Sequence, residues 1–262
     1  MSSTKPCDTM VFAPHPYDEA LGCAGMIYHQ LSEGRKVNVV LLTNGDADGN
    51  HWENLGGQKS RQEKMIEHGL VRQKESISAM AVIGLKEEHI TFLGYPDNGI
   101  EKMLSSENYT HINPYISTFT GLSSTAYDNS YQKNAPYCKA SLIGNIEAIL
   151  NEHQPKDIFI THPQDGHGDH SASGEMINNI VKKMKKPITT YGYYISRAPR
   201  VSSQKTSNRL FYKVTGKLKE LALDEKTRKM KERCLKMYKT QEYLFDSITD
   251  YFFIREYFWR LG

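Results

Sequence analysis

Short apolar runs alternate along this chain with longer segments in which apolar residues recur at helical spacing. The apolar runs of strand length cover residues 9–14, 37–43, 89–93, 157–161 and 189–195. Helical spacing covers residues 18–34, 61–83 and 138–153, and a further helix follows residue 170 and ends near residue 186. Strands that alternate with helices predict an α/β fold, namely a Rossmann-like, doubly wound and mainly parallel sheet with helices on both faces.

Two other segments complete this prediction. Residues 94–136 show no sustained period, are rich in Ser, Asn, Thr and Tyr, and are too long for an ordinary connection. We therefore predict that they form a functional loop or lid. Beyond residue 195 we expect a short strand at 210–214 and a charged helix at 217–240. No repeat or linker divides the chain, so we expect a single domain over residues 1–262.

The last aromatic cluster of the chain lies at residues 251–259 (YFFIREYFW). Aromatic side chains at this density are expected to be buried, because each carries a large apolar surface. Packing against the core of the same chain is the simpler interpretation. Contact with another subunit is the alternative, so a homo-oligomer stays open.

Composition limits the classes of partner. Charged residues make up 24% of the chain and the formal net charge is +3, so nothing in the balance requires nucleic acid or an anionic membrane. The basic run at 182–186 is expected to be a solvated helix face. The first nine residues lack the apolar stretch of a signal peptide, and no window approaches the roughly 18 apolar residues of a membrane span. We expect a cytoplasmic protein with no integral membrane segment and no nucleic-acid partner.

Cysteine and glycine spacing excludes two further kinds of site. The four cysteines are scattered without a C-x-x-C pair, which argues against a disulfide framework and against a thiolate zinc site. Gly22 and Gly25 lack the G-x-G-x-x-G spacing and fall inside a predicted helix, so no phosphate loop supports nucleotide binding.

Candidate chemistry is concentrated in two segments that follow predicted strands. The first is 13–19 (APHPYDE), directly after the first strand, and the second is 165–170 (DGHGDH), after the fourth strand. In a sheet of order 3-2-1-4-5, strands one and four are neighbours, and the crevice beyond their carboxyl ends is the point where ligands bind. The fold is therefore expected to bring the two segments together.

The contents of these segments suit a metal. Catalytic zinc takes three nitrogen or oxygen ligands and leaves one position for water, and His15, Asp18 and His170 supply such a set. Two histidines and one carboxylate also suit iron(II). Taken singly, the segments have a simpler interpretation as turns and helix caps, with Asp18 and Asp169 as N-cap residues.

At this point the sequence resembles the PIG-L or LmbE-like family of zinc-dependent de-N-acetylases. Members of that family carry His-Pro-Asp-Asp-Glu after the first strand and His-Pro-Asp-His after the fourth. Here the segments read His-Pro-Tyr-Asp-Glu at 15–19 and His-Gly-Asp-His at 167–170. Less specific points of similarity to the family are Arg72 with Glu75, the loop at 94–97 (GYPD) and the segment 238–241 (YKTQ).

The resemblance implies a function and a set of roles. Zinc would be bound by His15, Asp18 and His170, and the substrate would be an N-acetylated sugar, glycoside, nucleotide sugar or glycolipid. His167 would stabilise the oxyanion or protonate the leaving amine.

The resemblance also assigns three supporting residues. Asp169 would orient His167. Arg72 and Asp97 would contact the sugar, and a surface ion pair or a turn is the alternative for each. Residues 94–136 would border the active site.

One departure from the family pattern matters for catalysis. The first Asp of the family segment, which acts there as the general base, is Tyr17 in this chain. A phenol with a pKa near roughly 10 is a poorly matched base at neutral pH. Asp165 or Glu19 could replace the base, or Tyr17 could act directly as tyrosinate or as a hydrogen-bond donor. A catalytically weakened pseudoenzyme or sugar-binding module, and an amidase of a small non-sugar compound, are the remaining alternatives.

Overall fold

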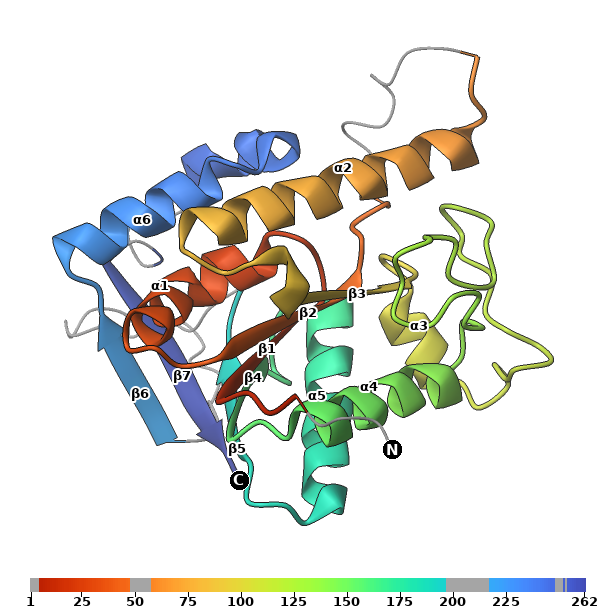
Figure 1. The fold of residues 1–262 in the computed structure, drawn as a ribbon. Helices are drawn as coiled ribbons and strands as arrows, with labels where there is room; N and C mark the ends of the chain where they lie inside the picture. The colour runs from red at the N-terminus through yellow and green to blue at the C-terminus, as the bar shows by residue number, and fades with distance from the viewer. Residues whose placement is uncertain (1–4, 48–57, 197–216, 248–251, 253) are drawn as a thin grey trace, which may run out of the picture.

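In the computed structural model, which describes residues 5–47, 58–196, 217–247, 252 and 254–262, one twisted sheet organises the chain (Figure 1). Its seven strands in the described residues have the order β3-β2-β1-β4-β5-β7-β6. They are β1 (Thr9–Ala13), β2 (Val37–Thr43), β3 (Ile90–Tyr95), β4 (Asp157–Thr161), β5 (Thr189–Tyr193), β6 (Lys217–Ala222) and β7 (Arg255–Leu261). The first five strands are parallel, and β7 and β6 continue the sheet in antiparallel pairing.

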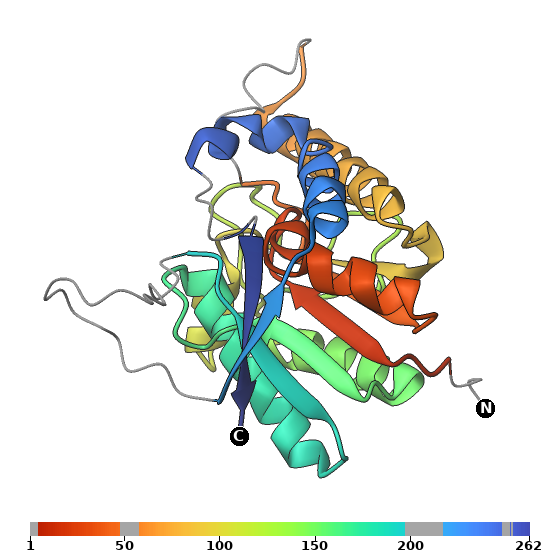
Figure 2. The ribbon, with the colours of Figure 1, turned by 90° about the vertical axis from the view of Figure 1, so that its left-hand side faces the viewer.

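Helices cover both faces of this sheet, as Figures 1 and 2 show. One face carries α1 (Asp18–Ser32), α2 (Arg61–Val82) and α6 (Glu225–Leu235), and the other carries α3 (Ile100–Ser105), α4 (Lys139–His153) and α5 (Gly168–Met184). Short 3₁₀ segments, η2 (Glu87–His89) and η3 (Lys239–Ser247), complete the helical part. The predicted α/β fold and the order of the first five strands are confirmed.

Strand β2 shows why the sheet is central. All seven of its residues are buried. Val39 and Leu41 pack in the core beneath α1 and α2, whereas Val40 and Leu42 pack in the core beneath α4 and α5. The alternation follows from the two-residue period of a strand. An apolar run of this kind is stable only where both faces are covered.

The C-terminal part contains the main error of the sequence-based prediction. Residues 217–240 were expected to form one helix, but the structure has β6, then α6, then η3. The sequence of β6 (KLKELA) consists of good helix formers, and its strand conformation comes from pairing with β7, a partner distant in sequence. The predicted strand at 210–214 lies outside the described residues.

The aromatic cluster packs within the chain. Phe258 and Trp259 of β7 are buried, and Trp259 lies edge-on to Tyr194 at 5.0 Å between ring centroids. Elsewhere on β7, Glu256 forms a buried ion pair of 2.6 Å with Lys231, and the side chains of Lys231 and Glu256 are 0% and 1% exposed. Glu256 also accepts hydrogen bonds from the backbone N–H groups of Gly25 and Met26 in α1. A Cβ atom at position 25 would lie about 3.0 Å from the Glu256 carboxylate, which explains the glycine.

The long segment 94–136 is better packed than a free loop. It includes α3, which the sequence analysis did not predict, and it buries Tyr115 and Tyr127. The backbone N–H of Tyr131 donates to the carbonyl of Phe92 in β3, so part of the segment lies along the outer edge of that strand. The four cysteines are buried and free of disulfide bonds.

Candidate active site

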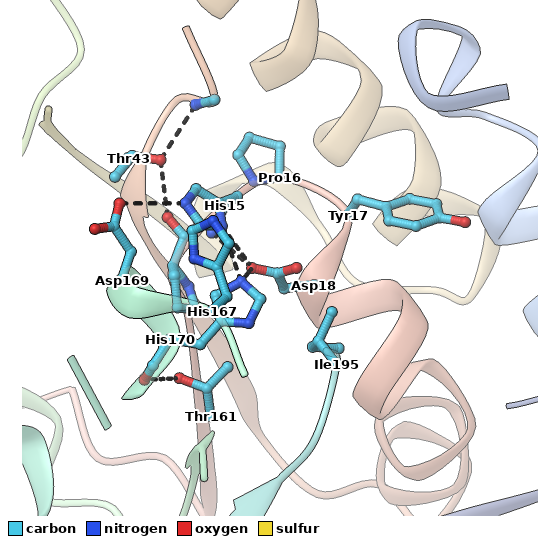
Figure 3. A network of polar contacts seen from close by, with 12 residues as sticks. His15, Pro16, Tyr17, Asp18, Thr43, Thr161, His167, Asp169, His170 and Ile195 are labelled. Carbon is cyan, nitrogen blue, oxygen red and sulfur yellow. Dashed lines mark hydrogen bonds and ion pairs between the residues drawn. The ribbon is translucent and has the colours of Figure 1, made fainter. Parts of the chain in front are cut away.

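The two predicted segments meet at the carboxyl ends of β1 and β4, which are neighbours in the sheet. His15 lies in the turn after β1, and Asp18 is the first residue of α1. His170 lies in the first turn of α5, after β4. Figure 3 shows the side chains of the three residues directed at one another.

The potential metal ligands form a nearly equilateral triangle. His15 Nδ1 lies 3.1 Å from Asp18 Oδ2 and 3.1 Å from His170 Nε2, and His170 Nε2 lies 3.2 Å from Asp18 Oδ2. Donor atoms bound to a tetrahedral zinc at about 2.0–2.1 Å are roughly 3.3 Å apart. All three side chains are nearly buried. The residues present therefore fit one divalent metal ion with an open fourth position.

Asp165 holds one of these ligands. Its Oδ1 lies 3.0 Å from Nδ1 of His170, which directs Nε2 of that ring toward the other two donors. The same carboxylate accepts hydrogen bonds from the backbone N–H groups of His167, Ile195 and Ser196. Four contacts occupy the carboxylate, so its position is that of a residue that orients a ligand rather than that of a base.

Asp97 and Asp169 hold the other histidine. Nε2 of His15 lies 3.1 Å from Asp97 and 3.5 Å from Asp169. Asp97 also accepts from the backbone N–H of Ala47, and Asp169 accepts from that of Glu101. Asp169 was expected to orient His167, but as the second residue of α5 its side chain is directed at His15 and at the start of α3.

The neighbouring histidines keep two buried carboxylates of the cluster ionised. Burial alone would raise the pKa of Asp18, but the adjacent His170 and His15 lower it below its usual range. Burial likewise opposes ionisation of Asp97, and the charge of His15 with its hydrogen bond lowers the pKa to about 2. Both carboxylates are therefore ionised at neutral pH. Buried carboxylates of this kind are stable only when they are paired or bind a metal.

His167 lies beside the triangle without belonging to it. Its ring centroid is 4.5 Å from that of His170 and 5.1 Å from that of His15. Its Nδ1 is buried and has no hydrogen-bond partner among the described residues. One of its nitrogens also lies within 4.8 Å of ligand atoms of His15 and His170, so the three histidines are a second set that could hold a metal ion. His167 also lines the cavity beside the triangle.

Tyr17 does not point at the candidate metal site. Its ring extends away from the three ligands (Figure 3) and packs edge-on against Tyr238, with 5.2 Å between centroids. Its hydroxyl is buried without a hydrogen-bond partner among the described residues, and burial raises its pKa. The backbone of Tyr17 has φ of 101°, a strained value for a residue other than glycine.

Glu19, the other candidate base, is buried away from the ligands. It accepts hydrogen bonds from the backbone N–H of Tyr17 and from the hydroxyl of Tyr238. Burial raises its pKa to about 7. Its contacts fix the start of α1 rather than reach the metal site.

A cavity of about 420 Å³ opens beside the triangle. It is lined by His15, Pro16, Tyr17, Asp18, Leu21, Arg72, Asp97, Asn98, His167, His170, Ile195, Ser196, Gln241, Tyr243, Leu244 and Phe252. Its volume lies within the range of about 300–1,000 Å³ that is usual for small-molecule sites. Arg72 is 5% exposed, and its two terminal nitrogens donate to the carbonyl oxygens of Gly45 and Pro16.

Six of the sixteen described lining residues lie outside the segments that the sequence analysis singled out for the site. Of the segment 94–136, only Asp97 and Asn98 are among the described lining residues. The far wall comes instead from Ile195 and Ser196 after β5 and from η3 and Phe252. Only the 238–241 segment gave a signal for this wall, through Gln241. No helix within the described part of the chain is long and apolar enough to span a membrane.

Comparisons with known proteins identify relatives of this chain. A curated relative, the probable N-acetyl-alpha-D-glucosaminyl L-malate deacetylase 2 of Bacillus cereus, is 26% identical over 178 residues, or 68% of this chain. The match spans 62% of the relative's own length.

Solved structures share the fold across nearly the whole chain. A deacetylase of the teicoplanin biosynthesis pathway is 15% identical with a TM-score of 0.61, and 97% of each chain is covered. The N,N'-diacetylchitobiose deacetylase of Pyrococcus horikoshii is 15% identical with a TM-score of 0.58, over 97% of this chain and 83% of that one. The sequence model of the PIG-L family, described as GlcNAc-PI de-N-acetylase, matches residues 10–181. The chain therefore belongs to the PIG-L family.

Proposed function

We propose that the protein is a zinc-dependent hydrolase that removes the acetyl group from the nitrogen of an amino-sugar derivative. The products would be acetate and a free amine. The observation that carries this proposal is the buried triangle of His15, Asp18 and His170 beside a cavity of about 420 Å³. Membership of the PIG-L family and the deacetylases among the relatives support it.

The three ligands would hold the metal through two nitrogens and one oxygen, as catalytic zinc sites do. The same set suits iron(II), so the native metal has to be measured. A bound divalent ion would supply Lewis acidity, polarising the amide carbonyl and making water more acidic. Asp165 would keep His170 in the orientation that binding requires, and Asp97 with Asp169 would do the same for His15.

His167 would move the proton. Asp97, Asp165 and Glu19 are occupied by the contacts described above, and the hydroxyl of Tyr17 points away from the ligands. His167 would accept the proton of the attacking water as the C–O bond forms. It would then give that proton to the nitrogen as the C–N bond breaks. In between, its N–H can donate to the developing oxyanion.

The test measures metal and acetate on the same sample. Elemental analysis of the purified protein is expected to find about one equivalent of metal. Acetate release from N-acetylglucosamine and its glycosides should stop after chelation and return when Zn²⁺ is added. His167→Ala should keep the metal and lower kcat about 10²- to 10⁴-fold.

Other outcomes separate the alternatives. Binding of an N-acetyl sugar by the metal-loaded protein without acetate release would identify a binding module. Acetate release from simple N-acetyl amines but not from sugars would identify an amidase of non-sugar compounds. Full activity after complete removal of the metal would refute the proposal.

A further inference from the structure

The cavity has two walls of different chemistry. One wall is polar and holds the candidate metal ligands. The apolar part of the lining, here named the apolar wall, consists of Leu21, Ile195, Leu244 and Phe252. Three of these four residues lie beyond residue 181 and therefore outside the family match. Figure 3 shows Ile195 beside Asp18, on the side away from Asp169.

The described lining offers little to a negatively charged group. Among its residues, Arg72 is the cation other than histidine, and its terminal nitrogens are already bonded to the Gly45 and Pro16 carbonyls. Its remaining nitrogen, Nε, has no hydrogen-bond partner among the described residues, but it is buried and does not reach the surface of the cavity. Asp18 and Asp97 add two carboxylates to the same lining. Ser196 and Gln241, at the edge of the apolar wall, are neutral.

These features discriminate between substrates. An anionic group next to the apolar wall would lose hydration without gaining a counter-ion, which is costly. An alkyl chain or an aromatic ring in the same place would gain free energy in proportion to the apolar area removed from water.

We propose that the apolar wall binds the group attached to the amino sugar, and that this group is uncharged and apolar. The inference rests on the proposed function and specifies its substrate class. It excludes malate and nucleoside diphosphate as the preferred attached group. The wall thereby determines specificity without touching the scissile amide.

The first experiment compares N-acetylglucosamine derivatives that differ only in the attached group. The probes are octyl and 4-nitrophenyl N-acetylglucosaminides in both anomeric forms, N-acetylglucosaminyl malate, UDP-N-acetylglucosamine and the free sugar. For at least one apolar glycoside, kcat/KM for acetate release should exceed that of the malate and UDP compounds by about tenfold or more. The octyl and nitrophenyl arms distinguish an alkyl chain from an aromatic ring.

The second experiment changes the wall. Ile195→Ala and Phe252→Ala should raise KM for the preferred glycoside about tenfold and leave kcat within about twofold, because the lost contacts are made equally in ground and transition states. The change in KM for free N-acetylglucosamine, which lacks the attached group, should be smaller than the change for the glycoside. Ile254→Ala is the matched control, because Ile254 is 41% exposed and is not among the lining residues. Ile195→Lys should improve the relative rate on the malate compound.

Each result decides one question. The proposed substrate class is overturned if the malate or UDP compounds are hydrolysed as well as the apolar glycosides. It is also overturned if the wall variants have an unchanged KM. Either result leaves the deacetylase function standing. No acetate from any compound by metal-loaded protein would overturn the function itself. In that case, calorimetric titration with the octyl glycoside, with Phe252→Ala as control, still measures whether the wall binds it.

Discussion

The two walls of the cavity come from parts of the molecule that are built differently. The wall with the metal ligands is formed by short loops at the ends of parallel strands. There, backbone N–H groups hold the carboxylates, and the carboxylates hold the imidazole rings. The apolar wall is formed mainly by η3, Phe252 and the residues after β5, together with Leu21 of α1. The first arrangement fixes the orientation of the imidazole rings. The second one excludes water and sets shape.

The two proposals assign reaction chemistry and recognition to largely separate stretches of the chain. Contacts between the stretches nevertheless couple them. Tyr238 donates to Glu19 at the start of α1, and Thr240 donates through its backbone N–H and hydroxyl to Glu75 of α2. Substitutions in one of the two parts at a time can therefore test whether the separation holds.

Removing a metal ligand should give the largest effect. His15→Ala or His170→Ala should abolish stoichiometric metal binding and lower acetate release by at least about 10⁴-fold, because the Lewis acid is lost with the ligand. Metal content and turnover are measured together. The control is His29→Ala, a half-exposed histidine on α1 that should keep both. A variant that lost the metal but kept turnover would show that the metal ligands are not needed for the reaction.

The next largest effect is expected in stability and arises in the C-terminal part. Lys231→Met leaves Glu256 as a buried carboxylate without its counter-ion, which costs about 3–5 kcal/mol. Urea unfolding followed by circular dichroism measures it.

The matched control for this variant is Lys229→Met on the same helix. Lys229 pairs with Glu225, and its side chain is 69% exposed, so its loss should hardly move the unfolding midpoint. Equal midpoints for the two variants would show that the buried pair does not stabilise the fold.

The residues of the candidate site show how much could be predicted from the sequence. His15, Asp18 and His170 were predicted correctly as neighbours because each lies within a few residues of a strand end, and the strand order follows from local apolar runs. The contacts of Asp97 and Asp169 with His15 were not predicted. They depend on where the residues before and at the start of α3 lie, and the segment 94–136 has no hydrophobic period from which this could be predicted. The C-terminal wall depends on the pairing of β6 with β7, which no local pattern specifies.

A smaller effect should follow from Asp165→Asn. The amide can still occupy the same space, but it weakens the orientation of His170, so metal affinity should fall about 10- to 100-fold. Competition with a chelator of known affinity gives the dissociation constant. If Asp165 were instead the general base, kcat at saturating metal would fall strongly with unchanged affinity. The two roles are thereby separated.

The smallest effect is expected for Tyr17→Phe. The hydroxyl has no hydrogen-bond partner among the described residues and points away from the ligands, so kcat should stay within about twofold. Thermal stability should be equal or slightly higher, since a buried polar group without a partner is removed. A loss of more than about tenfold in kcat would assign the hydroxyl a part in catalysis and would require the side chain to turn toward the metal site.

The contact of Tyr131 with Phe92 bears on behaviour in concentrated solution. Unpaired strand edges are templates onto which other chains can add, and this is a common origin of aggregation. The β3 edge is occupied in part by residues of 94–136, and the opposite edge strand, β6, exposes Lys217, Lys219 and Glu220. Charges of this kind hinder the approach of a second sheet. We therefore expect samples at crystallisation concentrations to stay free of fibrillar material, even though the sheet is open at both edges.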